Sequence, residues 1–118
     1  MTLRVEPLPF GEGQVECLRV EGERGPYTGF ATRTRDVATG RWVMVYTNAP
    51  RRTFARLEGE IAGARSTWTS TTVEPGRGSR LVSERLGPDA WRRTQLVSQD
   101  GGATWQELFT DELAREAR

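Results

Sequence analysis

The sequence predicts an all-β protein, a small antiparallel meander barrel of about eight to ten strands. Turn-forming residues (Gly, Pro, Asn and Asp) recur about every ten to fifteen residues, and short segments rich in Val, Thr and aromatic residues lie between them. No long helical pattern interrupts this series. Closing such a meander removes the exposed edges of an open sheet. Since 118 residues suffice for one core, we expect a single barrel domain over residues 1–118.

The predicted elements follow in order along the chain. The segments at 14–20, 41–47 and 66–73 have the composition of strands. In the second of them, Trp42, Met44 and Tyr46 alternate with two valines, which predicts a strand with its large side chains on one face. The tail at 112–118 is rich in helix formers and is predicted to be a strand end followed by a frayed or short helical segment. The predicted turns lie at 9–13, 22–26, 36–40, 48–51, 59–63, 75–78, 87–89 and 100–102.

Composition excludes several classes of function. The chain contains no histidine, which excludes Ser-His-Asp and Cys-His hydrolysis and His-ligated haem or zinc. The net charge of +1 lacks the basic excess typical of nucleic-acid binding. No phosphate-binding glycine motif is present, and we predict neither a metal nor a cofactor. The single cysteine, Cys17, is predicted to be a buried apolar side chain in a reducing cytoplasm. The start of the chain has no signal-peptide pattern and no run of apolar residues spans a bilayer, so we expect no membrane association.

The most specific motif lies near the C-terminus, where residues 98–105 read SQDGGATW and match an Asp-box, Ser-x-Asp-x-Gly-x-Thr-Trp. An aspartate of this kind folds back onto backbone N–H groups, the glycines allow positive φ, and the tryptophan anchors the returning strand. We therefore interpret the motif as a structural hairpin rather than a binding or catalytic site. Its residues are Ser98, Asp100, Gly102, Thr104 and Trp105.

From residue 29 to the end, the order of landmarks resembles a family of uncharacterised bacterial lipocalin-like proteins of the calycin group. The landmarks are GFATRTRD at 29–36, TGRW at 39–42, NAP at 48–50, LEG at 57–59, PDAW at 88–91 and the Asp-box. The resemblance implies an eight-to-ten-stranded barrel with a central cavity, in proteins whose activity is generally unassigned. The chain lacks the Gly-x-Trp opening of secreted lipocalins, and it lacks the histidine on which the haem-binding relatives depend.

Aromatic and basic residues supply the candidate ligand contacts. If the interior holds a ligand, its wall is predicted to include Trp42, Met44, Tyr46 and Trp68, although packing in a core is the favoured interpretation of each aromatic residue. Arginines inside strands, Arg33 and Arg93 among them, are expected on the solvated outer face. The functional alternative is that one or two point inward, pair with Glu58, Glu84 or Glu107, and bind a carboxylate-bearing ligand. Arg93 is therefore included among the ligand-binding candidates.

Three functions remain open at this stage. The first is binding of a small, mostly apolar molecule in a central cavity, with a carboxylate as an optional feature of the ligand. The second is a homodimeric structural or interaction module with a filled barrel. The third is a cofactor-free cyclase or isomerase that uses a buried carboxylate. Glu107 is the leading candidate for this carboxylate, because Trp105 and Phe109 flank it on one strand face. An enzyme is the less favoured of these alternatives.

Overall fold

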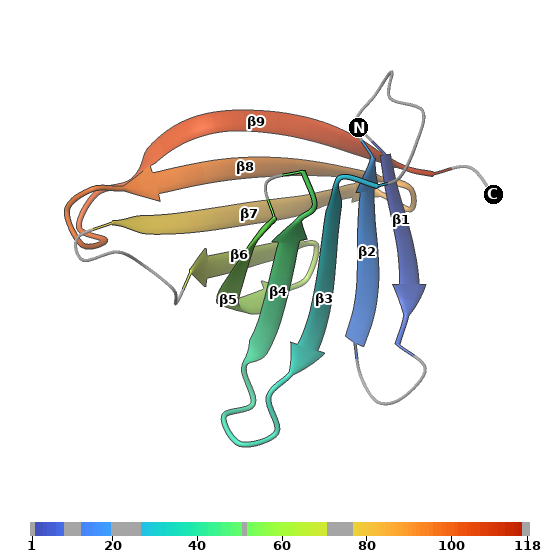
Figure 1. The fold of residues 1–118 in the computed structure, drawn as a ribbon, viewed down its shortest axis with the longest axis horizontal. Helices are drawn as coiled ribbons and strands as arrows, with labels where there is room; N and C mark the ends of the chain where they lie inside the picture. Colours follow the sequence, from blue (N-terminus) through green and yellow to red (C-terminus); the bar gives the residue numbers. More distant parts are fainter. Residues whose placement is uncertain (1, 9–12, 20–26, 51, 71–76, 117–118) are drawn as a thin grey trace.

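The computed structural model describes residues 2–8, 13–19, 27–50, 52–70 and 77–116. Within these ranges the chain forms nine strands and no helix, and the strands close into a barrel (Figure 1). The predicted fold class, a small all-β barrel of eight to ten strands, is thereby confirmed. The strands are β1 (Thr2–Pro7), β2 (Gly13–Arg19), β3 (Gly29–Arg35), β4 (Trp42–Asn48), β5 (Thr53–Ala62), β6 (Arg65–Ser70), β7 (Gly78–Gly87), β8 (Ala90–Ser98) and β9 (Gln106–Arg115).

The barrel closes between its first and last strands. Consecutive strands pair antiparallel from β1 to β9, and an odd number of alternating strands leaves the first and the last running in the same direction. The closing pair is accordingly parallel and short, with Thr2 opposite Ala114 and Leu3 opposite Arg115. Leu3 and Leu113 are buried at this seam. In Figure 1, β7, β8 and β9 lie across the view and β1 to β4 lie close to vertical, as expected for a strongly twisted sheet.

The hydrophobic core fills the middle of the barrel on its β3 to β7 side. Four buried residues, Ala31, Met44, Leu57 and Trp68, form this cluster. Trp42, Tyr46, Ala55 and Leu81 are partly buried and pack against it. The inward face of β4 is the one that its alternating pattern predicts, because Trp42, Met44 and Tyr46 all contribute to the cluster.

The turn predicted at 59–63 is wrong at its beginning, because β5 continues through Gly59 to Ala62. Gly59 lies in register with both Trp42 and Trp68. A Cβ atom at this position would overlap the Thr67 carbonyl oxygen and lie 2.7 Å from Cε3 of the Trp68 ring. The glycine therefore allows Trp68 to lie flat against the strand, and the turn itself is formed by Gly63 with a φ of 61°.

The strand end predicted in the tail is confirmed, since β9 continues as a strand to Arg115. Tertiary contacts hold this segment extended: the Arg115 backbone N–H donates to the Asp89 carbonyl at 2.8 Å, and its Nε donates to Asp89 Oδ1 at 2.8 Å. These contacts outweigh the weak helix propensity of a short tail. The predicted turns at 9–13, 22–26 and 75–78, the strand end at 71–73 and the tail end at 117–118 lie wholly or partly outside the described residues.

The Asp-box forms the connection between β8 and β9. Asp100 Oδ1 accepts hydrogen bonds from the Ser98 hydroxyl at 2.8 Å and from the Thr104 N–H at 2.9 Å, and Oδ2 accepts one from the Thr104 hydroxyl. The Ser98 Oγ in turn accepts the Gly102 N–H at 2.8 Å, and Gly102 has a φ of 95°. Trp105 packs beside Gly78. The guanidinium carbon of Arg80 lies over the Trp105 ring, 4.1 Å from the ring centroid. The motif thus attaches the hairpin to the start of β7.

Replacing Asp100 with alanine should lower the melting temperature by a few degrees, because three acceptor contacts of the turn are lost. These hydrogen bonds, chiefly those from Thr104, hold the pKa of Asp100 at about 2. A depressed folded-state pKa adds stability above the unfolded pKa, and this stability is lost as the pH falls towards about 2. Thermal unfolding followed by circular dichroism at neutral and acidic pH tests this. The exposed neighbour Gln99, replaced by alanine, serves as the control.

The outer surface carries exposed apolar side chains on neighbouring strands. Phe30 and Phe54 both lie in register with Thr47, and the Phe54 side chain is 74% exposed. Tyr27 packs edge-to-face on Phe30, with ring centroids 6.2 Å apart. Among the described residues, no helix is long and apolar enough to cross a membrane.

Candidate ligand-binding cavity and its buried ion cluster

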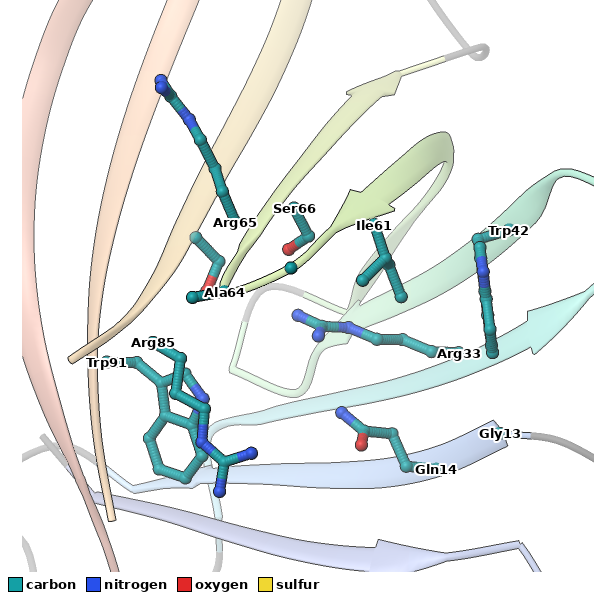
Figure 2. A pocket seen from close by; sticks show the side chains of 12 residues that line it. Gly13, Gln14, Arg33, Trp42, Ile61, Ala64, Arg65, Ser66, Arg85 and Trp91 are labelled. Atoms are coloured by element: carbon teal, nitrogen blue, oxygen red, sulfur yellow. The ribbon is translucent and has the colours of Figure 1, made fainter. Parts of the chain in front are cut away.

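A cavity of about 290 Å³ opens at one end of the barrel (Figure 2). Its lining comes from β2 to β8 and the β5–β6 turn, at the strand ends that a meander brings together. Trp42, Ile61 and Trp91 give it apolar surface, and Gln14, Ser66 and Ser83 give it neutral polar groups. The barrel is therefore filled in its middle by the core and hollow at this end.

Three arginines line the cavity, and they differ in their environment. Arg85 donates to the carbonyl oxygens of Gly87 and Pro88, at 3.0 Å each. The Arg65 side chain is drawn pointing away from the other lining residues (Figure 2). Arg33 extends from β3 into the space between β2 and β6 and is only 8% exposed. Arg33 is therefore the buried guanidinium of the cavity.

Two neighbours hold Arg33 in this position. Its guanidinium carbon lies 4.9 Å from the centroid of the Trp68 ring, a cation–π contact. Its Nη2 lies 3.3 Å from Glu16 Oε1, but the two groups are not aligned as a hydrogen bond. Nε and Nη2 are consequently buried without a hydrogen-bond partner. Unsatisfied donors of this kind are uncommon in protein interiors and call for an explanation.

Glu16 is the carboxylate of a buried cluster of three charges. It is 4% exposed, and its Oε2 accepts a hydrogen bond from Arg93 Nη2 at 2.7 Å, across from β8. Gln14 Nε2 donates to its other oxygen at 3.1 Å. Glu16 is therefore shared between two guanidinium groups, Arg33 and Arg93, from opposite sides of the barrel.

Burial and charge act in opposite directions on this cluster. Burial by itself raises the pKa of Glu16, but Arg93 and Arg33 together outweigh it and hold the pKa below its ordinary value. Burial is the main cause that lowers the pKa of Arg33 to about 10; Glu16 opposes this shift and Arg93 adds to it. At neutral pH both guanidinium groups and the carboxylate are therefore charged, leaving one positive charge in excess within the cluster.

The predicted ligand-binding residues fall in two places. Trp42 lines the cavity, whereas Met44, Tyr46 and Trp68 lie in or against the core below it. Trp68 is fully buried, and its indole N–H donates to the Ser66 hydroxyl at 2.9 Å. Arg93 is held by Glu16 at the edge of the same interior. The structure thus brings Trp42, Trp68 and Arg93 around Arg33 and Glu16 rather than along one open wall.

Three expectations about individual side chains are wrong. Arg33 and Arg93 lie in the interior, which is the alternative to the favoured solvated face, and their partner is Glu16 instead of Glu58, Glu84 or Glu107. Glu107 is exposed and accepts a hydrogen bond from the Thr110 hydroxyl at 2.6 Å, so it is no buried general base. Cys17 is half-buried rather than buried, and partial burial raises the pKa of its thiol.

Glu16, the functional residue that the sequence reasoning missed, has a weak signal. It lies between Val15 and Cys17. If the apolar side chains of β2 are assumed to face the interior, Glu16 is placed on the outer face, which is wrong. Gln14 and Glu16 are two residues apart in a strand, so their side chains lie on the same face. Only the distant arginines show that this polar face points inward.

No group of three or more His, Cys, Asp and Glu side chains in the described part of the chain is arranged to hold a metal ion. Comparison with protein-family models, with curated proteins and with solved structures finds no match for this chain. The function of this chain must therefore be inferred from the cavity and the side chains that line it.

Proposed function

We propose that this protein is a lipocalin-like barrel that binds a small molecule in the cavity at the open end of its interior. The observation that carries the proposal is the cavity of about 290 Å³, because its lining combines apolar surface with a few convergent polar groups. That combination is typical of small-molecule sites. The volume lies at the low end of the usual range for such sites, which favours a compact ligand over a long acyl chain.

One set of interior residues supports the cavity and another set lines it. Met44, Leu57 and Trp68 fill the barrel below the cavity and give it a rigid floor. Trp42 and Trp91 offer flat apolar surfaces to a ligand above that floor. The resemblance to the lipocalin-like group implies a barrel with a central cavity, which agrees with this proposal. The single cysteine supports a reducing cytoplasm as the location.

A cavity-filling variant tests the proposal. In Ile61→Trp the larger side chain occupies part of the cavity from its rim, so ligand binding should be lost while the fold is retained. Val37→Trp is the matched control, since Val37 is 99% exposed in the β3–β4 turn and lies outside the cavity.

Binding is measured by protein NMR with a panel of small probes that includes 2-naphthoate, 2-naphthamide, decanoate and decanol. We expect chemical-shift changes that concentrate on the cavity residues, disappear in Ile61→Trp and persist in Val37→Trp. Changes scattered over the surface, or none with any probe at millimolar concentration, would contradict a binding function for this cavity.

A further inference from the structure

We infer that the cavity holds an anion subsite at Arg33, and that its ligand is a singly charged carboxylate that binds this guanidinium. This inference rests on the proposed function, because it assigns the chemical class of the molecule in the same cavity. Three observations support it: the position of Arg33, the missing hydrogen bonds of its N–H donors, and the charges of the neighbouring side chains.

Position is the first argument. The Arg33 side chain lines the cavity and is at the same time nine-tenths buried. Figure 2 shows its guanidinium directed towards the strand that carries Ser66 and away from Trp42. A ligand in the cavity is therefore in reach of Arg33 as well as of Trp42 and Ile61, which line the same space.

The donors of Arg33 provide the second argument. A guanidinium has five N–H groups in a fixed fork that matches the two oxygens of a carboxylate. In Arg33, Nε and Nη2 are buried and make no hydrogen bond. The Trp68 ring lies against the guanidinium and supplies no acceptor in the plane of its N–H groups. Leaving such donors unpaired is costly. A small rotation of the side chain into the cavity that it lines would let a ligand carboxylate satisfy them.

Charge provides the third argument. The cluster contains two guanidinium groups, Arg33 and Arg93, and one carboxylate, Glu16. Arg93 makes the well-aligned hydrogen bond to Glu16 at 2.7 Å, whereas Arg33 has only the poorly aligned contact at 3.3 Å. Glu16 therefore neutralises Arg93 more fully than Arg33. Arg33 thus keeps most of its positive charge unbalanced, which favours a single carboxylate group at this guanidinium.

The neighbouring arginines explain why the subsite lies at Arg33. Arg85 uses its donors on the carbonyls of Gly87 and Pro88. Asp111 is opposite Arg93 in the strand register, so a further acid also lies on the Arg93 side of the cluster rather than beside Arg33. The ligand is thus expected to place its acidic group against Arg33 and its apolar body along Trp42 and Trp91.

The experiment compares 2-naphthoate with 2-naphthamide, which has nearly the same shape and no charge, by isothermal titration calorimetry. We expect the acid to bind at least about tenfold more tightly than the amide, as the loss of a charge-assisted hydrogen bond implies. Arg33→Met should abolish this preference while leaving the affinity for the amide within about twofold. Arg92→Met is the matched control, because Arg92 is an exposed arginine of β8 that pairs with Glu112 on the outside of the barrel.

A second variant keeps the inference testable if Arg33→Met does not fold. In Glu16→Gln the internal carboxylate that competes for Arg33 is removed, so the affinity for 2-naphthoate should rise by about tenfold and that for the amide should not change. Equal binding of acid and amide to the unmodified protein would overturn the anion subsite and leave the cavity proposal intact. Binding of neither probe, or of any member of the wider panel, would contradict the proposed function itself.

Discussion

Replacing Trp68 with alanine is expected to lower the free energy of unfolding by about 3–5 kcal/mol, the usual range for a large aromatic side chain in a core. Trp68 is fully buried at the centre of the cluster formed with Ala31, Met44 and Leu57. Its loss opens a void that these neighbours cannot close, because β5 passes directly beside the ring at Gly59. The same substitution removes the cation–π partner of Arg33.

Equilibrium unfolding in urea measures this effect through the midpoint and the slope of the transition. Phe54→Ala is the matched control: it also removes an aromatic side chain from a central strand, but from one that is 74% exposed on the outer face. We expect the control to change stability only slightly. A loss of less than about 1 kcal/mol in Trp68→Ala would show that the centre of the barrel is not packed around this ring.

Local pattern was enough to predict the architecture. Turn residues at regular spacing indicated a meander, and the strand from Trp42 to Tyr46 shows its inner face in its own alternation. Both signals are local, because strand period and turn chemistry depend on neighbouring residues. The same locality explains one error. Gly59 looked like a turn residue because its close neighbour Trp68 is known only from the register of β5 and β6.

The interior charges were beyond the reach of such patterns. Glu16 and Arg93 are 77 residues apart in the chain, and only the closed barrel places their strands across a common interior. An arginine in a strand is normally solvated, so the expectation for Arg33 and Arg93 followed the usual energetics of burial. The exception occurs at the candidate site, where the structure keeps charged groups inside despite their desolvation. Such departures from the local rule are expected where function constrains a sequence.

Replacing Glu16 with alanine is expected to cost about 3–5 kcal/mol, because it leaves two buried guanidinium groups facing each other without their shared carboxylate. Adding Arg33→Met to this variant should restore part of the loss, since one of the two uncompensated charges is then gone. A simple cavity at position 16 predicts no such recovery. Glu60→Ala, at an exposed position of β5, is the matched control and should change stability little.

The effect of Glu16 should depend on pH with a definite sign. Arg93 and Arg33 hold the folded-state pKa of Glu16 below its ordinary value, so its contribution is complete above the unfolded pKa of about 4.3. This contribution falls as the pH decreases through the folded-state pKa. The difference in unfolding free energy between the unmodified protein and Glu16→Ala should therefore be constant from about pH 5 to 8 and shrink below about pH 4. A difference that stays constant into this acid range would mean that the carboxylate contributes through its packing, and that the two arginines do not need its charge.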